Sequence, residues 1–436
     1  GQPGVLYDAV YSEAFRQTLF DALAKRRKFR TEAGELVFNA DRLMGKEAKE
    51  LVEVRSKVLS AEQSNTSIIF ADRFFLKLYR KIDDALNPDV EITRFLTERA
   101  KFAHTPRYLG AIEWQRGESS FVMGMMQELV RNQGDAWEYF KSPLGRYFER
   151  VEALPEDERK PPKVVGTLTA PATFEQTPEV MQEIIGGAYV ERLELLGRRT
   201  AGMHLALAGH RKVEGFEPEE FSLHYQRSLY SSLQAMVKNN FGTLKAHLKS
   251  VPEAARAEAE GVLALRPAVI DVMKQIYDHK IETLKIRNHG DYHLGQVLFT
   301  GKDFVIIDFE GEPARSFSER RLRRSALRDV AGMLRSFHYA AYSALFAKNG
   351  EDSDELAPWA EQWYHYAGGF FMGSYLEELG SDTTLIPQDR NDFGLLLRVF
   401  LLEKAVYELG YELNNRPTWV GIPLRGISTL MQGLSD

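Results

Sequence analysis

Hydrophobic and polar residues alternate through much of the first 130 residues, which is the pattern of half-buried strands. Apolar segments 68–70 and 74–79 flank an Ala-Asp-Arg turn, and segments 107–115 and 119–126 flank Arg-Gly-Glu. Both arrangements predict β-hairpins. From Leu51 the valines at 52, 54 and 58 share one face of a further predicted strand. Helices are predicted over 11–30 and from Pro88.

The remaining residues follow a mostly helical period. Segments 178–207 and 222–284 and the chain from Ser325 onward are predicted helical, after a Pro-rich loop over 155–171. A short β hairpin is predicted at 296–299 and 303–309. The sequence therefore predicts an α+β, bilobal protein, with an N-terminal lobe over 1–130 and a helical C-terminal lobe over 131–436. Two lobes usually enclose a cleft.

The composition excludes several classes of chemistry. The 436 residues are 44% hydrophobic and 27% charged, as in ordinary globular proteins. The absence of cysteine excludes disulfides, zinc–thiolate sites and Cys nucleophiles. The 56 basic and 62 acidic residues, a net charge of −6, provide no overall field for nucleic acid or an anionic membrane.

Neither a membrane partner nor a nucleic-acid partner is predicted. No apolar run approaches the ~18–20 residues that span a bilayer, because charged residues interrupt the strongest candidate, 395–406. We expect a cytoplasmic protein. The opening Gly-Gln-Pro-Gly fits either a processing scar or a domain excised from a longer chain.

The densest polar cluster is Asn-His-Gly-Asp-Tyr-His-Leu-Gly-Gln at 288–296, and Asp308 follows Asp291 by 17 residues at the end of an apolar strand. Phosphoryl transfer needs a carboxylate for the acceptor proton, oxygen ligands for Mg²⁺ and a cation on the donor phosphates. Asp291 fits the first role, and Gln296 and Asp308 fit the second. The alternative is a polar turn with a structural His289.

The pattern His-Gly-Asp-x-His-x-x-Gln followed by Ile-Asp-Phe-Glu resembles the aminoglycoside-phosphotransferase-like kinases, which are relatives of protein kinases. Gln296 departs from their usual Asn. Blocks in both predicted lobes resemble the maltokinase family more closely: 62–67, 75–79, 307–313, 328–333 and 411–419. Members of that family occur alone or fused to trehalose synthase. The resemblance implies a protein-kinase-like fold, with Asp291 and His289 in the catalytic loop.

Within that resemblance, Lys77 corresponds to the strand lysine that holds the donor phosphates, and Glu91 to its helix partner, although Asp89 and Glu98 lie nearby. The alternative is an edge-strand lysine that points to solvent. Further contacts to the nucleotide are expected from a polar turn and from the strand that joins the lobes: Ser64, Asn65, Thr66, Ser67, Gln127 and Leu129. The turn could equally be an ordinary hairpin turn.

The acceptor site is expected to combine polar groups with an aromatic platform. The residues implied are His293, Glu310, Tyr407, Tyr411, Glu412, Arg416 and Trp419. The alternative for the last group is a helix end with a packed Trp419. Segment 315–328 contains six arginines: either some of them clamp the acceptor or the transferred phosphate, or they form a solvated face or a contact to another domain. Asp329 is expected to anchor the catalytic loop.

The resemblance thus implies an ATP- and Mg²⁺-dependent maltokinase that phosphorylates maltose at its anomeric hydroxyl for α-glucan synthesis. Trehalose synthase is the expected protein partner. Two alternatives stay open: a kinase of another small molecule on the same fold, and a catalytically silent module that binds a nucleotide or sugar.

Overall fold

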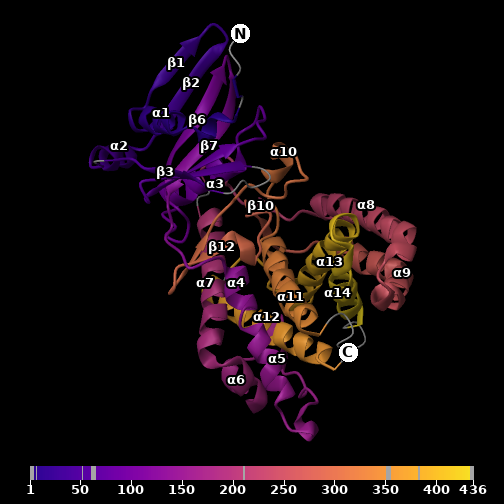
Figure 1. Ribbon diagram of the computed structural model, residues 1–436. Coiled ribbons are helices and arrows are strands. Elements are labelled where there is room, and N and C mark those ends of the chain that lie inside the picture. The colour runs from indigo at the N-terminus through magenta and orange to yellow at the C-terminus, as the bar shows by residue number, and fades with distance from the viewer. Residues whose placement is uncertain are drawn as a thin grey trace. The chain divides into compact units, whose positions relative to one another are not determined.

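The computed structural model describes residues 4–5, 7–51, 53–59, 65–209, 212–349, 355–381 and 383–432 (Figure 1). The chain divides into two compact units. The first contains Gly1–Gln133 and Val305–Leu322, and the second contains Gly134–Phe304 and Arg323–Asp436. The sequence-based division put all of 131–436 in the C-terminal lobe, whereas segment 305–322 packs with the first unit.

The first unit is built on a seven-stranded antiparallel sheet with the strand order β1-β2-β6-β7-β5-β4-β3. Its elements are η1 (Ala9–Tyr11), α1 (Glu13–Ala24), β1 (Lys28–Thr31), β2 (Gly34–Ala40), α2 (Arg42–Lys49), β3 (Ser56–Val58), β4 (Asn65–Phe70), β5 (Phe74–Tyr79), α3 (Pro88–Arg94), the π-helical turn η2 (Phe95–Arg99), β6 (Tyr108–Arg116), β7 (Ser119–Glu128) and α10 (Phe317–Arg320).

The core of this unit lies between helix α1 and the sheet. Phe20 of α1 is buried, and its ring centroid lies 5.2 Å from that of Phe70 on β4 and 5.4 Å from that of Phe74 on β5. Burial of each large apolar side chain stabilises the fold by roughly 1.5–3 kcal/mol. This packing fixes β4 and β5, the two strands that carry Asn65 and Lys77.

The second unit is mostly helical. Its elements are α4 (Ala136–Lys141), α5 (Leu144–Glu152), η3 (Glu156–Glu158), β8 (Gly166–Thr167), β9 (Ala170–Pro171), η4 (Phe174–Gln176), α6 (Glu179–Ile185), α7 (Gly187–Ala208), β10 (Glu219–Glu220), α8 (Leu223–His247), η5 (Leu248–Ser250), α9 (Glu253–Lys274), η6 (Gln275–Tyr277), β11 (Leu284–Lys285), η7 (Leu294–Gln296), β12 (Val297–Phe299), α11 (Leu327–Asn349), α12 (Ala357–Leu379), α13 (Arg390–Asn415), η8 (Pro417–Trp419) and α14 (Gly421–Gln432). The boundary between the units falls inside β13 (Phe304–Ile306).

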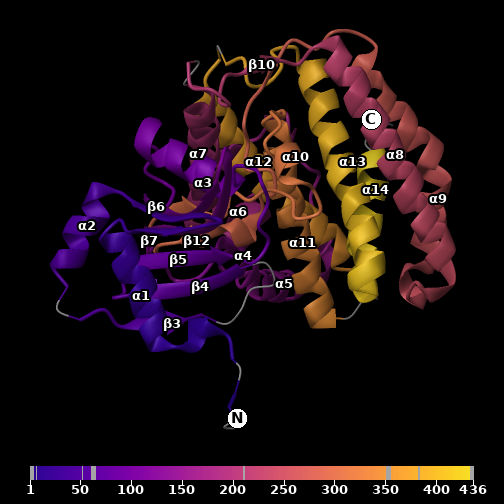
Figure 2. The ribbon, with the colours of Figure 1, turned by 90° about the horizontal axis from the view of Figure 1, so that it is seen from above.

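The long helices of this unit pack in two sets. Helices α8, α9, α13 and α14 lie side by side, and α11 packs on α13 (Figure 2). Helices α7 and α12 pack closely along each other. Gly197 of α7 permits the close approach, because a Cβ atom there would overlap Ser374 Oγ and the Phe371 carbonyl of α12. Helix α11 also contacts η7, the short helix of the catalytic-loop segment.

Three elements differ from the sequence expectation. The helix expected over 11–30 ends at Ala24, and the strand expected from Leu51 is limited to Ser56–Val58. The helical segment 222–284 is divided into α8 and α9, because Pro252 lacks the N–H group that would continue a helix. No helix in the described part of the chain is both long and apolar enough to cross a bilayer.

Candidate active site

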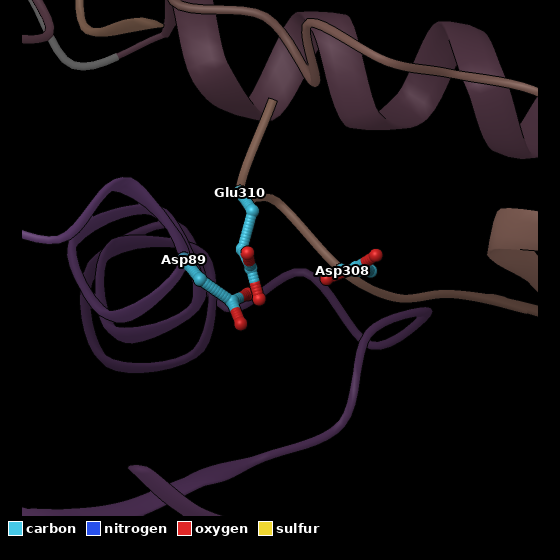
Figure 3. Close-up of side chains that lie close together, drawn as sticks. All are labelled: Asp89, Asp308 and Glu310. Atoms are coloured by element: carbon cyan, nitrogen blue, oxygen red, sulfur yellow. The ribbon is translucent and has the colours of Figure 1, made fainter. Parts of the chain in front are cut away.

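Lys77 is the centre of a charged cluster in the first unit. It lies on β5, is 6% exposed, and its Nζ contacts carboxylate oxygens of Asp89 at 3.0 Å, Asp308 at 2.5 Å and Glu310 at 2.5 Å. Figure 3 shows the three carboxylates. Burial lowers the pKa of Lys77, but attraction to the carboxylates outweighs burial and holds it well above the usual value. The lysine therefore remains charged, which excludes the alternative of an edge-strand lysine in solvent.

Asp89, rather than Glu91, is the helix residue that pairs with Lys77. Asn87 caps α3 by accepting the backbone N–H of Asp89 at 2.9 Å, which fixes Asp89 in the first turn. The Asp89 carboxylate also accepts the backbone N–H of Phe309 at 3.0 Å. The expected Lys77–Glu91 pair is therefore wrong. Two residues further along α3, Glu91 instead forms a bidentate ion pair with Arg321, with both distances 2.9 Å.

The segment after β13 brings Asp308 and Glu310 to this lysine. Asp308 has a φ of +67°, a left-handed conformation that is uncommon for a non-glycine residue and that recurs at functional sites. The Glu310 carboxylate also accepts a hydrogen bond from Asn65 Nδ2 at 2.7 Å. Glu310 was expected to contact the acceptor, but its described contacts are with these nucleotide-site candidates.

Asp89, Asp308 and Glu310 are suited to hold a divalent cation. Carboxylate oxygens of the three residues lie within 4.8 Å of one another, and hard oxygen ligands are what Mg²⁺ prefers. The pKa of Glu310 is raised, mainly because its carboxyl group is buried. The attraction of Lys77 lowers this pKa, and the repulsion from Asp89 and Asp308 raises it further. Positive charge added beside these carboxylates would relieve that repulsion. Gln296, the other expected metal ligand, is half-buried at the end of η7 in the second unit.

Asn65, Thr66 and Ser67 are buried residues of β4 rather than members of a turn. Ser67 is directly opposite Lys77 in the β4–β5 register, and the Thr66 hydroxyl accepts hydrogen bonds from Arg80. All three pair with residues of β5 in the antiparallel register, which places them in the strand. Ser64, the other member of the expected phosphate-binding turn, lies outside the described residues.

The strand residues expected beside the nucleotide base are part of the sheet. Gln127 lies in β7, opposite Phe75 of β5 and Tyr108 of β6. The backbone N–H of Leu129 donates to the carbonyl of Arg73 at 2.8 Å. This donor already has a partner, so Leu129 could pair with a base through that N–H only after the sheet contact opens.

The segment expected to form the catalytic loop lies in the second unit and is anchored by Asp329 at the start of α11. The Asp329 carboxylate accepts the backbone N–H of His289 at 2.7 Å and that of Gly290 at 3.0 Å. His204 of α7 lies 3.2 Å from the same carboxylate. Burial raises the pKa of Asp329, but the hydrogen bond from His204 and the neighbouring charges hold it below the usual value. The predicted anchoring contact is confirmed.

Asp291 is held as a carboxylate. Lys404 of α13 approaches it at 3.3 Å, and the two side chains are 28% and 24% exposed. Burial raises the pKa of Asp291, but Lys404, His293 and His289 outweigh burial, so the pKa lies below the usual value. Lys404 was not predicted as a site residue from the sequence. The only signal in the sequence that could have indicated this residue is its position as a lysine inside the apolar run 395–406, which the structure shows to be part of α13.

The two histidines of the loop stabilise its backbone. His289 is 1% exposed, and its Nδ1 accepts the backbone N–H of Asp291 at 3.4 Å. His293 Nδ1 accepts the N–H of Gly295 at 3.1 Å and so caps the short helix that ends at Gln296. Both contacts are within the loop. His289 and His293 are therefore positioning residues by geometry.

The aromatic and charged residues expected at the acceptor site do gather around the end of α13. Glu412 is 1% exposed and accepts from Tyr339 Oη at 3.1 Å and from Arg416 at 2.7 and 3.0 Å. The Arg416 guanidinium lies 4.8 Å from the Trp419 ring centroid and 5.4 Å from that of Tyr411. Tyr411 is 45% exposed. We call Tyr411, Glu412, Arg416, Trp419 and Tyr339 the α13 cluster.

The same helix carries further ion pairs nearer the loop. Tyr407 stacks with Lys404, whose Nζ lies 5.2 Å from the ring centroid. Glu408 pairs with buried Arg335 at 2.8 Å, and Glu403 pairs with Arg328 at 2.6 Å. The sequence analysis missed Arg335 and Glu403 because their partners lie about 70 residues away on another helix.

Four of the six arginines of segment 315–328 pair with acids of their own units, and Arg320 donates to backbone carbonyls of the first unit. Besides Arg321 with Glu91 and Arg328 with Glu403, Arg315 pairs with Glu312 at 2.6 Å, and Arg323 with Glu217 and Glu219 at 2.9 and 2.7 Å. Those pairs fit a structural role better than a phosphate clamp.

Comparison with known proteins relates this chain to glucosamine kinases. No protein-family model matches it. Two curated relatives are glucosamine kinases. The one from Streptacidiphilus jiangxiensis is 29% identical over 238 residues, which are 54% of this chain and 48% of the relative. The one from Mycolicibacterium smegmatis is 31% identical over 150 residues, which are 34% of each chain. The matches thus span half or less of these relatives. A solved structure, a glucosamine kinase in complex with glucosamine, ADP and inorganic phosphate, gives a TM-score of 0.67 at 21% identity over 96% of this chain and 83% of that one.

These likenesses establish the fold. The chain has the bilobal, α+β, protein-kinase-like fold, with the seven-stranded sheet in the first unit and the long helices in the second.

Proposed function

We propose that the protein is an ATP-dependent sugar kinase that phosphorylates maltose at its anomeric hydroxyl. The cluster around Lys77 carries the proposal. A buried strand lysine held by a helix carboxylate and by the Asp308 segment is what phosphoryl transfer needs to position donor phosphates. The named relatives, all glucosamine kinases, support phosphoryl transfer to a sugar.

Asp291 is the proposed base. Its carboxylate is ionised beside Lys404 and accepts the proton of the acceptor hydroxyl. The hydroxyl oxygen forms a bond to the γ-phosphorus, the bond from that phosphorus to ADP breaks, and the proton passes from Asp291 to solvent. Asp329 keeps the loop backbone in place. Asp308 and the neighbouring carboxylates would hold Mg²⁺, which would neutralise the phosphate charge, and Gln296 stays a predicted metal ligand.

The proposed acceptor pocket runs along α13 from Lys404 to the α13 cluster. Eight residues of α-helix separate Lys404 from Glu412, a rise of about 12 Å, which is room for more than one sugar ring. Tyr411 and Trp419 offer apolar faces, Arg416 offers a polar group, and buried Glu412 orients Arg416. The maltokinase-like block 411–419 supplies four of the five residues of this cluster, and it is the reason for proposing maltose.

Glucosamine is the second candidate acceptor, because both curated relatives are glucosamine kinases. Its ammonium group needs a carboxylate partner. The acids along α13 already have cationic partners: Glu403 has Arg328, Glu408 has Arg335 and Glu412 has Arg416. This balance of charge favours a neutral acceptor. A trehalose-converting partner enzyme stays a prediction.

The test is incubation with ATP, Mg²⁺ and separate sugars, with products followed by phosphorus NMR. We expect an anomeric phosphate doublet with maltose and none with glucosamine, glucose or choline. A phosphate monoester formed only from glucosamine would keep the kinase and reject maltose. Mg²⁺-dependent nucleotide binding without any turnover would instead indicate a silent binding module.

A further inference from the structure

A second pocket lies in the first unit, with a volume of about 720 Å³. It is formed by the β4–β5 turn, the connection from η2 to β6, and the end of β7 with the residues that follow it. None of Lys77, Asp89, Asp308 and Glu310 lines it. Of the residues expected at the nucleotide site, Leu129 alone lines this pocket.

The pocket wall contains a surplus of positive charge. Arg107 pairs with two carboxylates, Glu47 at 2.9 Å and Glu128 at 3.3 Å, so these three residues together carry one negative charge. The other charged residues of the lining are Arg73, Lys101, Arg131 and Asp72.

Arg73, Lys101 and Arg131 are exposed, and their side chains form no ion pair or hydrogen bond with the described part of the chain. With Asp72 counted, the lining holds four basic and three acidic residues, a net charge of +1. Three cations from three separate segments thus meet at one pocket. Guanidinium and ammonium groups in such an arrangement recognise phosphate oxygens, which accept several charge-assisted hydrogen bonds at once.

Unusual backbone surrounds the same pocket. Ala71, Asp72 and Lys101 have φ angles of +51°, +50° and +56°, and the π-helical turn Phe95–Arg99 supplies Thr97 to the lining. Left-handed non-glycine residues and π-helical turns both cost free energy and concentrate at ligand sites. In the described part of the chain, two other non-glycine residues have a left-handed φ angle, and one of them is Asp308 of the candidate active site.

The floor offers an unpaired polar group beside apolar surface. Thr105 is 6% exposed, lines the pocket, and its hydroxyl has no hydrogen-bond partner among the described residues. Phe102 and Leu129 lie in the same lining. A buried hydroxyl without a partner is unfavourable, and because this oxygen is fully buried, a ligand oxygen would satisfy it only after a change of the Thr105 rotamer.

We propose that this pocket binds a small phosphate ester. Arg73, Lys101 and Arg131 hold the phosphate group, and the body of the ligand lies on Phe102 and Leu129 beside Thr105.

Titration of glucose 6-phosphate, followed by calorimetry and by phosphorus NMR line width, tests the site. We expect saturable binding to the native protein. Arg131→Gln and Lys101→Gly should each weaken it about tenfold, as the loss of one charge-assisted contact predicts. Glycine at 101 keeps the left-handed backbone available. Arg116→Gln is the matched control, because Arg116 is an exposed residue of the same unit outside the pocket and should bind like the native protein.

The Lys77→Met variant separates this site from the candidate active site. Retained binding of glucose 6-phosphate by that variant supports the pocket, whereas its loss would assign the ligand to the Lys77 cluster and overturn the proposal. Equal weakening by Arg131→Gln and Arg116→Gln, or no saturable binding at millimolar ligand, would also overturn it. None of these readouts requires turnover, so failure of the proposed kinase function leaves the test intact.

Discussion

Asp291 combines a depressed pKa with a place in a loop whose backbone is fixed by Asp329. If it is the base, Asp291→Asn should reduce kcat by about 10²–10⁴-fold, the usual contribution of a positioned base. The isosteric amide should leave thermal unfolding within a few degrees of the native protein. Steady-state kinetics and a melting curve measure both, and near-native turnover would contradict the role.

Lys404 should set the pH at which Asp291 ionises. Removing its charge in Lys404→Met removes an interaction that lowers the pKa of Asp291, so the pKa rises. The acid limb of the kcat/KM profile should therefore move to higher pH. Lys404→Arg, which keeps the charge, should leave the limb close to its native position. A limb that stays fixed in both variants would show that another group controls it.

Asp89 and Glu91 provide a direct comparison of two acids on one helix. Asp89→Asn removes a charge from buried Lys77, and loss of one partner of a buried pair costs about 3–5 kcal/mol. We expect kcat/KM for the nucleotide to fall at least a hundredfold. Glu91→Gln affects a pair whose arginine is 36% exposed, so the loss should stay below about tenfold. The reverse order would restore Glu91 as the lysine partner.

The Asp89 example shows what sequence spacing leaves open at the residue scale. The motifs identified Lys77, Asp291 and Asp308, because each follows a recognisable apolar or polar pattern. They did not decide between Asp89 and Glu91, because both lie in the first turn of α3, and the choice depends on where segment 305–322 supplies Arg321 and the Phe309 N–H.

At the scale of elements, α11 supports the catalytic loop through a glycine. A Cβ atom at Gly332 would lie 2.5 Å from the backbone oxygen of Tyr292, and that oxygen could move only with the loop. Gly332→Ala should therefore lower kcat by at least tenfold while nucleotide binding changes little. The effect is measured by comparing kcat with the nucleotide Kd.

Gly242→Ala in α8 is the matched control for that substitution. A Cβ at Gly242 meets nothing within 4 Å, so alanine should stabilise the helix by about 0.5–1 kcal/mol without an effect on kcat. Equal kinetics for the two alanine variants would contradict loop support by α11.

The periodicity of the sequence predicted the hairpins and the long helices but not all their ends. The hairpin β4–β5 and the strand β12, which follows the expected catalytic loop, lie where the sequence pattern predicted strands. The helix expected over 11–30 gave way to β1, because Lys28–Thr31 pair with Gly34–Val37 of β2. That tertiary pairing overrides helix propensity and is invisible to a local pattern.

At the scale of the whole molecule, the first unit is discontinuous, since the chain returns to it at 305–322 after 171 residues in the second unit. The sequence indicated two lobes with a boundary near 130 but assigned this segment to the helical lobe. The segment follows the expected catalytic loop in the sequence, but its charged and apolar side chains contact residues of the first unit. Long-range complementarity of that kind is not encoded in local periodicity.

The discontinuity predicts that residues 1–133 alone form an incomplete unit. Segment 305–322 buries Phe309 and Phe317 and supplies the Glu91–Arg321 and Asn65–Glu310 contacts. Burial of the two aromatic side chains alone should contribute roughly 3–6 kcal/mol. A fragment of residues 1–133 should therefore unfold at lower urea concentration than the same fragment joined to 305–322 by a flexible linker. A fragment joined to a scrambled copy of the segment is the control. Equal urea midpoints for the native and scrambled segments would show that 305–322 contributes nothing to the stability of this unit.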